Sequence, residues 1–546
     1  MNKPVPDSST PANSLALSAP QPEQTQDAAA NNLYTDTRGL SSQPRPFSEV
    51  IVQGLASGGG LFVPKTRPRL SVNQIASLGR LPYYQQAALL FQAWGVDFSF
   101  DQIQTAMALA YSENFDTPEI APLVQVEPAT WILELFHGPT AAFKDLALQC
   151  LPLFFTAAIQ RQAAASAAIP YYLLLVATSG DTGSAAQMGF QDHEHTGVIV
   201  FFPASGTSDL QRRQMTSAPG KNVGAVAVRG NFDDCQTSIK AIFNDADFNA
   251  TLAHQNVLLS SANSINWGRL LPQVVYYVSA YARLLAQGAL RPGELLDVCV
   301  PTGNFGNILA AWYAKAIGTP LGQLFCASNE NHVLTDFLNS GTYDIQDRPF
   351  QRTPSPSMDI LVSSNLERQL FELNGRDPQR IRQWMTDLRD QRRFQVDKDT
   401  FAALRANYSA DWVSNADSLA TIRAVFNEWN YLLDPHTAVA WQVAERLRPT
   451  PRRPLLVVST AHWAKFGADV YRALHELRPE QALPDSVAAL DGLQLIQQIQ
   501  QETAAGALPP ALAALERRPI RFDQSSGSQP AELRRLIDAW LREHVL

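Results

Sequence analysis

The 546-residue chain is poor in cysteine: it has four, and no two of them form a Cys-x-x-Cys pair. Such wide spacing is typical of neither a disulfide framework nor a structural zinc site, so we expect reduced thiols, no metal site and a cytoplasmic protein. No uninterrupted apolar run is long enough to cross a membrane. The N-terminus also lacks the basic and then apolar pattern of a secretion signal, so we expect no membrane association.

Positive charge is scarce as well, because 43 Lys and Arg residues stand against 51 Asp and Glu residues, a net charge of -8. This balance argues against nucleic acid or an anionic membrane as the main partner. The Gly-x-x-x-x-Gly-Lys-Ser/Thr motif does not occur, so nucleotide hydrolysis is not indicated. With 45% hydrophobic residues, the composition is that of a globular protein long enough for two to four domains.

One lysine, Lys144, stands in apolar company. It follows Ala141-Ala142-Phe143 and precedes Asp145 and an apolar run, shortly after the turn signal Gly138-Pro139. A lysine in apolar surroundings is easily kept neutral, and a neutral amine condenses with a carbonyl to give a Schiff base. The alternative is a lysine at the edge of a buried helix that pairs with the neighbouring aspartate. This stretch alone does not decide between the two interpretations.

Seven near-continuous apolar runs alternate with helical patterns beyond residue 170. Such runs are typical of parallel strands covered by helices on both faces, and seven of them suit two sheets better than one. In sheets of this kind, ligands bind at the carboxyl ends of the strands and between domains. The predicted strands are 171–177, 198–202, 225–229, 257–260, 295–300, 324–327 and 455–458.

Two of these strands run into loops suited to an anion. Residues 178–182, Thr-Ser-Gly-Asp-Thr, place hydroxyls and backbone N–H groups at the start of a helix, although an ordinary capped turn is the alternative. After the 295–300 run, Gly303 and Gly306 allow a ligand close to the backbone. The helix that begins near Asn307 adds a positive dipole end. We interpret this second loop as a phosphate cradle.

The last predicted strand ends in Ser459 and Thr460. A neutral hydroxyl at this position can bond a ring nitrogen without forcing a proton onto it. Carbanion chemistry on pyridoxal phosphate (PLP) needs a Schiff-base lysine, a phosphate cradle and a partner for the pyridine nitrogen. Lys144, the 303–307 loop and one of these two hydroxyls are candidates for the three parts.

At these positions the sequence resembles threonine synthase of the longer bacterial and fungal kind, within the fold-type II PLP enzymes. Nine blocks match in the family's order, which makes the resemblance specific. They are residues 34–39, 54–64, 134–149, 177–186, 263–269, 301–307, 355–368, 434–439 and 459–466.

The resemblance implies an α/β fold similar to the β subunit of tryptophan synthase, with two parallel-sheet α/β domains plus an N-terminal, mainly helical domain. We expect the N-terminal domain at 33–120, and a large PLP-binding domain made of 121–169 and 256–546. A small mobile domain at 170–255 would close on the substrate. Residues 1–32, rich in Ser, Pro, Ala and Gln without periodicity, predict a disordered tail.

The resemblance further implies the last step of threonine biosynthesis, in which O-phospho-L-homoserine and water give L-threonine and phosphate by γ-elimination and β-addition of water. Lys144 would bind PLP and then move protons. The substrate is a small molecule, and we expect a monomer or homodimer. The other implied site residues are Gly303, Asn304, Phe305, Gly306 and Asn307 for the cofactor phosphate, Thr460 for the ring nitrogen, and Ser179, Gly180, Asp181, Thr182, Arg38, Asn263 and Arg269 for the substrate.

The chain departs from the family after Pro203, where a Gly followed by Lys or Arg is usual and residues 204–209 are Ala-Ser-Gly-Thr-Ser-Asp. Two alternatives therefore stay open: a related PLP-dependent elimination or replacement enzyme acting on another γ-activated amino acid, or an inhibitor-tolerant isozyme. A third is a non-catalytic PLP-binding relative, against which the intact Lys144 argues. We interpret His436 as structural, and His137 as either structural or close to the site.

Overall fold

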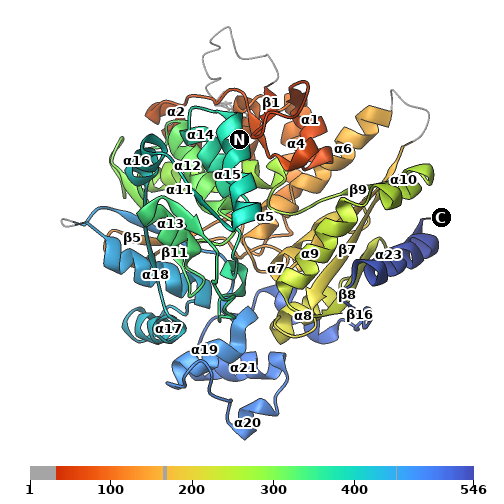
Figure 1. Ribbon diagram of the computed structural model, residues 1–546. Helices are drawn as coiled ribbons and strands as arrows, with labels where there is room; N and C mark the ends of the chain where they lie inside the picture. The colour runs from red at the N-terminus through yellow and green to blue at the C-terminus, as the bar shows by residue number, and fades with distance from the viewer. Residues whose placement is uncertain (1–31, 164–168, 450–451, 546) are drawn as a thin grey trace, which may run out of the picture.

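The computed structural model describes residues 32–163, 169–449 and 452–545 (Figure 1). The tail predicted at 1–32 lies outside the described residues except for Asn32. This residue is buried, and its Nδ2 donates to the carbonyl oxygens of Thr66 and Trp94 at 2.8 and 3.2 Å. Within the described ranges, the longest apolar helices still fall short of what a membrane crossing requires.

Short antiparallel strands and four helices form the N-terminal region. The strands pair in the order β2-β1-β3. Ser71 and Ser99 each begin a helix with a capping box, in which the serine hydroxyl and a glutamine three residues later satisfy each other's backbone N–H. The elements are β1 (Leu33–Asp36), β2 (Arg45–Pro46), α1 (Phe47–Gln53), β3 (Phe62–Pro64), α2 (Val72–Leu78), α3 (Tyr83–Ala93) and α4 (Phe100–Ala110).

A six-stranded sheet forms the core of the larger half, with the order β14-β11-β10-β15-β5-β4. All neighbours pair in parallel except β4 and β5. Successive side chains of β10 pack on opposite faces of the sheet. Val298 and Val300 pack on α11 (Trp267–Ala286) and α12 (Gly306–Ala316), and Cys299 packs on α18 (Pro435–Leu447). The strands are β4 (Leu123–Glu127), β5 (Thr130–Glu134), β10 (Leu296–Pro301), β11 (Leu321–Ser328), β14 (Tyr408–Trp412) and β15 (Leu455–Ser459).

A five-stranded parallel sheet forms the smaller half, with the order β16-β8-β7-β6-β9. The sequence analysis assigned 256–546 to the large domain, and the strand pairing corrects this at two places: β9 extends this sheet beside β6, and β16 pairs with β8. The last helix, α23 (Pro530–His544), packs on the same sheet through Leu533, Ile537 and Leu541. The strands are β6 (Tyr171–Ala177), β7 (Thr196–Pro203), β8 (Val223–Arg229), β9 (Val257–Ser260) and β16 (Ser525–Gly527).

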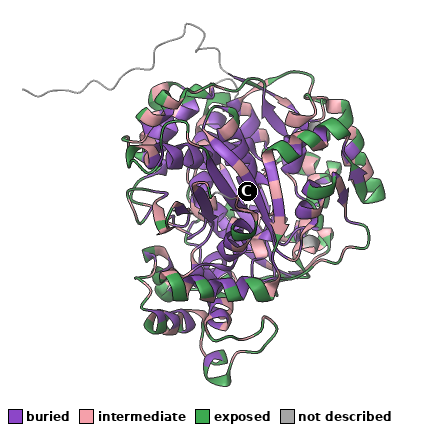
Figure 2. Ribbon diagram, turned by 90° about the vertical axis from the view of Figure 1, so that its left-hand side faces the viewer, coloured by how far each residue is buried: buried purple, intermediate pink, exposed green. Residues whose placement is uncertain are grey.

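All seven predicted strands are present, and two parallel sheets covered by helices confirm the α/β class (Figure 2 shows burial concentrated in and between them). The strand pair β12 (Thr342–Asp344) and β13 (Arg393–Gln395) stands apart from both sheets. The helices of the smaller half are α7 (Asp181–Phe190), α8 (Asp209–Thr216), α9 (Phe232–Phe243) and α10 (Ala246–His254). Those around the larger sheet are α5 (Lys144–Leu148), α6 (Leu151–Ala163), α11 (Trp267–Ala286), α12 (Gly306–Ala316), α13 (Val333–Ser340), α14 (Leu366–Leu373), α15 (Pro378–Gln391), α16 (Lys398–Asn407), α17 (Asn415–Trp429) and α18 (Pro435–Leu447).

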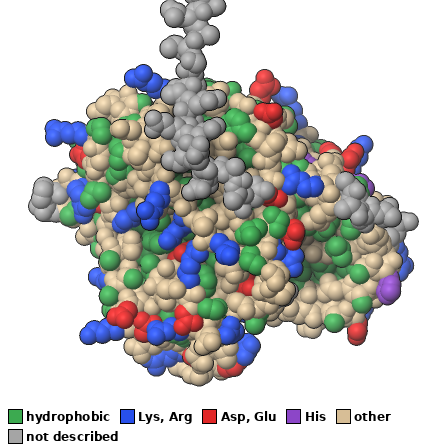
Figure 3. Space-filling model, turned by 90° about the horizontal axis from the view of Figure 1, so that it is seen from above, with side chains coloured by type: hydrophobic (Ala, Val, Ile, Leu, Met, Phe, Trp, Pro, Cys, Tyr) green, Lys and Arg blue, Asp and Glu red, His purple; other side chains and the backbone are tan. Residues whose placement is uncertain are grey.

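Four further helices follow β15 before the chain returns to the smaller half, and the first three of them lie below the two sheets in the view of Figure 1. The four are α19 (Gly467–Leu474), α20 (Asp485–Ala488), α21 (Gly492–Thr503) and α22 (Pro510–Ala513). On the face seen from above, Lys and Arg side chains are scattered among neutral and hydrophobic ones, with acidic side chains between them (Figure 3). This face therefore has no continuous basic belt.

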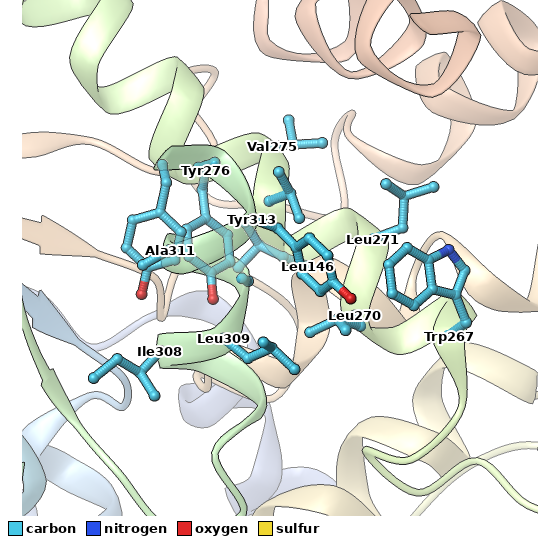
Figure 4. Packing of buried hydrophobic residues seen from close by; sticks show 14 of the residues in the cluster. Leu146, Trp267, Leu270, Leu271, Val275, Tyr276, Ile308, Leu309, Ala311 and Tyr313 are labelled. Carbon is cyan, nitrogen blue, oxygen red and sulfur yellow. The ribbon is translucent and has the colours of Figure 1, made fainter. Parts of the chain in front are cut away.

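The helices that position the site pack directly on one another (Figure 4). Leu146 of α5 lies among Trp267 and Leu270 of α11 and Leu309 and Tyr313 of α12, and all five are buried. Burial of this kind is worth about 25 cal/mol per Å² of apolar surface, so the three helices are held firmly against each other. Lys144 at the start of α5 and the loop before α12 are therefore fixed by the same packed cluster.

Candidate active site

A cavity of about 940 Å³ lies at the carboxyl ends of strands from both sheets, and Lys144 is in its wall. Two predicted site residues, Gly180 and Asp181, do not line it. A Cβ on Gly180 would meet the Gln211 side chain at 2.5 Å, and the Asp181 carboxylate lies behind the wall residue Ser357, whose Oγ donates to it at 3.0 Å. The predicted residues that line it are Arg38, Lys144, Ser179, Thr182, Asn263, Arg269, Gly303, Asn304, Phe305, Gly306, Asn307 and Thr460.

The Lys144 side chain is largely buried in the wall of this cavity, with 11% of its surface exposed. Its Nζ donates to Ser357 Oγ at 3.3 Å and lies 3.9 Å from Asp181 Oδ2. Burial lowers the pKa of Lys144 from 10.5 to about 8, helped by Arg269 and opposed by the Asp181 carboxylate. A substantial share of the amine is therefore neutral at mildly alkaline pH, which favours the first of the two interpretations of its apolar sequence.

The loop after β10 is the predicted phosphate cradle. A Cβ on Gly303 would meet the Ser357 carbonyl oxygen at 2.5 Å, so glycine is required there. Phe305 adopts a left-handed conformation (φ 62°) and begins α12 without a side-chain hydrogen bond to the first turn. The first N–H groups of α12 are consequently left to face the cavity, as an anion needs.

Of the two hydroxyls at the end of β15, only one is available. Ser459 Oγ accepts a hydrogen bond from Thr437 Oγ1 at 3.0 Å. Thr460 lines the cavity, and its hydroxyl has no protein partner among the residues that the structure describes. Thr460 is therefore the better of the two candidates for a ring-nitrogen partner.

The loop after β6 has a different construction. Thr178 Oγ1 accepts hydrogen bonds from the N–H groups of Gly180 and Gly183 at 2.9 and 3.2 Å, so the start of α7 is capped from within. Ser179 and Thr182 face the cavity. Asp181 is 2% exposed, and burial would raise its pKa, but nearby lysines outweigh burial and hold that pKa below its usual range.

The two arginines predicted near the substrate are differently engaged. Arg38 pairs with both oxygens of Glu367, at 3.0 and 2.8 Å, and donates to the Gly58 carbonyl oxygen at 3.0 Å. Arg269 donates through one terminal nitrogen to the Ala262 carbonyl oxygen at 2.6 Å, while its buried Nε has no partner in the described part of the chain. Burial lowers the pKa of Arg269 to about 10, so the group stays charged.

Ser357, His436 and Lys465 are site residues that the sequence analysis missed or placed elsewhere. The Ser357 N–H donates to His436 Nε2 at 3.2 Å, so the His436 proton lies on Nδ1, which donates to Asp434 Oδ1 at 2.8 Å. Both Ser357 and His436 line the cavity. No local pattern marks them, because their neighbours come from distant parts of the chain.

His137 lies seven residues before Lys144 but is not in the cavity wall. Its Nδ1 lies 2.5 Å from Asp116 Oδ1 and its Nε2 3.0 Å from Glu134 Oε2. Burial opposes the charged ring, but the two carboxylates prevail and raise the pKa of His137 to about 9. The structural interpretation of His137 therefore fits its position.

Residues 204–209, where the sequence departs from the family pattern, also lie away from this cavity. Ser208 caps α8, and Gly206 to Asp209 line a separate cavity of about 660 Å³. The basic residue absent from this segment would therefore not face Lys144 in this arrangement. Lys240 of α9 does line the main cavity and donates to Gln236 Oε1 at 3.1 Å.

These residues fit PLP on their own geometry. The amine of Lys144 is desolvated, the cradle at Gly303 has no room for a Cβ, and the Thr460 hydroxyl has no protein partner within residues 32–163, 169–449 and 452–545. Lys144 would bind the cofactor, the 303–307 backbone its phosphate, and Thr460 its ring nitrogen.

Three family descriptions match the chain in succession: "Threonine synthase N terminus" at residues 33–111, "Pyridoxal-phosphate dependent enzyme" at 115–460 and "Threonine synthase, C-terminal" at 437–537. Threonine synthase of Pseudomonas aeruginosa is 35% identical over 88% of this chain and 97% of its own. The Saccharomyces cerevisiae enzyme is 38% identical over 82% of this chain and 90% of its own.

Human threonine synthase-like 1 is 46% identical over 78% of this chain, and the chain spans 58% of the length of that relative. Among solved structures, PLP-bound threonine synthase from Brucella melitensis has a TM-score of 0.78 and 34% identity, covering 94% of this chain and 99% of its own. Yeast threonine synthase has a TM-score of 0.81 and 32% identity with the same coverage. The chain belongs to the threonine synthase family of pyridoxal-phosphate dependent enzymes, as the resemblance indicated.

Proposed function

We propose that the protein is a threonine synthase, which converts O-phospho-L-homoserine and water to L-threonine and phosphate. One observation supports this above all: a single cavity brings a desolvated lysine together with an uncapped helix start and an unpartnered hydroxyl at a strand end. These are the three contacts that PLP chemistry requires. The matches to family descriptions at residues 33–111, 115–460 and 437–537 support the same reaction.

When bound, PLP supplies an electron sink that acidifies the carbon atoms of the attached substrate. The chain's own task is then to move protons. Lys144 Nζ, with a pKa of about 8, is poised to accept a proton and return it, and Ser357 Oγ at 3.3 Å holds the amine in place. Thr460, a neutral hydroxyl, would bond the ring nitrogen without protonating it, which would keep the electron sink moderate and limit side reactions.

The substrate has two anionic ends, and the cavity offers each a partner. Ser179 and Thr182 are suited to the carboxylate, because their hydroxyls lie at the start of α7. Arg269 and Lys240 are charged groups in the wall that suit the leaving phosphate. Arg38 is held by Glu367, so it acts on the phosphate only if that ion pair opens.

A second candidate is a related PLP-dependent elimination or replacement enzyme that acts on another γ-activated amino acid. The Arg38–Glu367 pair favours it, because this pair removes one cation from the group available to a phosphate dianion. The non-basic 204–209 segment points the same way.

The test is to incubate the PLP-loaded protein with O-phospho-L-homoserine and to measure phosphate and threonine in the same sample. Equal amounts of both products, absent with Lys144→Ala, would support threonine synthase. PLP loading without either product would contradict it, and other γ-activated amino acids would then be tried in the same assay.

A further inference from the structure

A second lysine, Lys465, is completely buried beside the site and has no role so far. It lies in the short 3-10 helix η3 (Trp463–Phe466), directly after the strand end that provides Thr460. Its Nζ lies 2.7 Å from Asp181 Oδ1 and donates to the Thr140 carbonyl oxygen at 2.8 Å. A buried ammonium group is tolerated only when it is paired and hydrogen-bonded in this way.

The two oxygens of Asp181 serve two different lysines. Oδ1 accepts from Lys465 and, at 2.9 Å, from Gln211 Nε2. Oδ2 accepts from Ser357 Oγ at 3.0 Å, and Lys144 Nζ is 3.9 Å away, beyond direct hydrogen-bond distance. Lys465 therefore has the closer contact with this carboxylate, and Lys144 reaches it mainly through the Ser357 hydroxyl.

Among the groups nearest to Asp181, buried bases outnumber buried carboxylates. These groups are the bases Lys144, Lys465 and Arg269 and the carboxylates Asp181 and Asp145. Burial of excess charge is costly, so the least well paired base gives up its proton. That base is Lys144, since Lys465 has a direct ion pair and an arginine keeps its proton.

Among the described residues, the other titratable groups around the two lysines form no ion pair or hydrogen bond with either amine. Burial lowers the pKa of His462 to about 3, so that ring is neutral. The two ring nitrogens of His436 are engaged by the Ser357 N–H and by Asp434 Oδ1. Burial raises the pKa values of Asp145 and Asp359 to about 6, which leaves both mostly ionised above that pH. Asp359 is satisfied by Thr353 and Asn329 rather than by either lysine.

We propose that Lys465 is a positioning residue for Lys144: by occupying Asp181, it prevents this carboxylate from holding Lys144 as an ammonium ion and keeps the amine ready to react with the cofactor's carbonyl. The inference rests on Lys144 as the cofactor lysine, which is part of the proposed function. It does not depend on the identity of the amino-acid substrate.

The test measures the rate at which PLP-free, full-length protein takes up PLP, followed by the absorbance of the lysine-bound cofactor from pH 6 to 10. In the unmodified protein the rate should rise with a midpoint near pH 8, the pKa of Lys144. Lys465→Met should move the midpoint up by about one pH unit or more, and slow uptake at pH 7 about tenfold. Lys465→Arg keeps the charge and should restore the midpoint.

Asp181→Asn gives a prediction of opposite sign, because it removes the carboxylate that favours the ammonium form. Its midpoint should move down, which also tests the proposal if Lys465→Met does not fold. Lys315→Met is the matched control: Lys315 Nζ donates to the Gly322 carbonyl oxygen at 2.7 Å, remote from Asp181, and its loss should leave the midpoint in place.

Unchanged midpoints in Lys465→Met and Asp181→Asn would overturn the proposal, as would a Lys465→Arg protein that behaves like Lys465→Met. The readout is uptake of PLP and involves no O-phospho-L-homoserine. A protein that failed to make threonine would therefore still report on Lys465, and the two failures are distinguishable.

Discussion

The loop after β10 and the loop after β6 both join a parallel strand to a helix at the wall of one cavity, but they leave different groups for a ligand. In the first, carbonyl oxygens are held from outside: Gly303 O accepts from Ser363 Oγ at 2.8 Å, and Asn304 O accepts from the Asn365 N–H at 3.1 Å. The helix that follows has no side-chain cap. In the second, Thr178 Oγ1 already accepts from two N–H groups of the loop.

This difference separates a permanent ligand from a transient one. Uncapped N–H groups are costly to leave without a partner, so the first loop suits an anion that stays, such as a cofactor phosphate. The second loop is satisfied without a ligand and exposes the hydroxyls of Ser179 and Thr182. It suits a substrate that arrives and leaves in every turnover.

Lys144→Ala should have the largest effect, since Lys144 lies beside the first loop and faces the second across Ser357. We expect kcat to fall by about a thousandfold or more, because both covalent attachment and proton transfer are lost. PLP should still bind, reversibly, through the first loop. Phosphate release measures the loss of kcat, and equilibrium dialysis with PLP measures reversible binding to the Lys144→Ala protein. If this variant bound no PLP, the first loop would not be an independent phosphate site.

Gly303→Ala should damage the first loop alone. The added Cβ would meet the Ser357 carbonyl oxygen at 2.5 Å, so the backbone must shift, and we expect PLP affinity to fall roughly ten- to hundredfold. Gly306→Ala is the control in the same loop, because its Cβ would meet Asn365 Nδ2 at an ordinary 3.4 Å. Equal PLP affinities of the two variants, measured by equilibrium titration, would argue against the cradle.

Thr178→Val should damage the second loop alone. Two buried N–H groups lose their acceptor, which costs about 1–3 kcal/mol of unfolding free energy and loosens the start of α7. We expect a several-fold higher KM for the amino-acid substrate with little change in PLP affinity. Thr302→Val removes a hydroxyl that donates to the Val300 carbonyl oxygen at 2.7 Å and accepts from no loop N–H among the described residues, so it should change KM less.

The smallest expected effect is that of the Asp181 carboxylate, in the second loop, on the pH dependence of stability. Because the pKa of Asp181 is held low in the folded protein, its contribution to stability is present above the unfolded pKa of about 3.9 and is lost as the pH falls below it. Unfolding by urea between pH 5 and 3 should show a steeper loss in the unmodified protein than in Asp181→Asn, by up to about 1.4 kcal/mol per pH unit. Parallel curves would mean that Asp181 is not charged in the fold.

Local sequence predicted the parts of the molecule whose signal is local. The seven strands predicted from near-continuous apolar runs are all present, and the glycines of the 303–307 loop line the cavity together with Lys144. Strand β5 was not predicted, although Trp131, Ile132 and Leu133 form a short apolar run in it. Strand β16 was missed because Ser525–Gly527 has no hydrophobic residue, so only its backbone pairing with Ala227–Arg229 reveals it. For the same reason its membership of the smaller half was not predicted.

Contacts between distant residues were beyond local reasoning. The sequence placed Arg38 near the substrate but gave no sign that Glu367 holds it. It identified Asp181 as a ligand of the substrate, whereas the side chain turns to Lys465 and Ser357. Which of two adjacent hydroxyls, Ser459 or Thr460, is available also depends on a tertiary neighbour, Thr437.

The positions of β16 and α23 in the sequence affect how the smaller half folds during synthesis. During synthesis, β8 emerges well before its partner strand β16 and the covering helix α23, because both lie far beyond it in the sequence. Until both have been made, the nascent sheet has an unpaired edge and a partly uncovered apolar face, which are hazards for aggregation. Folding of the smaller half is therefore expected to be completed only after residues 525–544 have been made, and a chain truncated near residue 520 should be less soluble than the 546-residue chain.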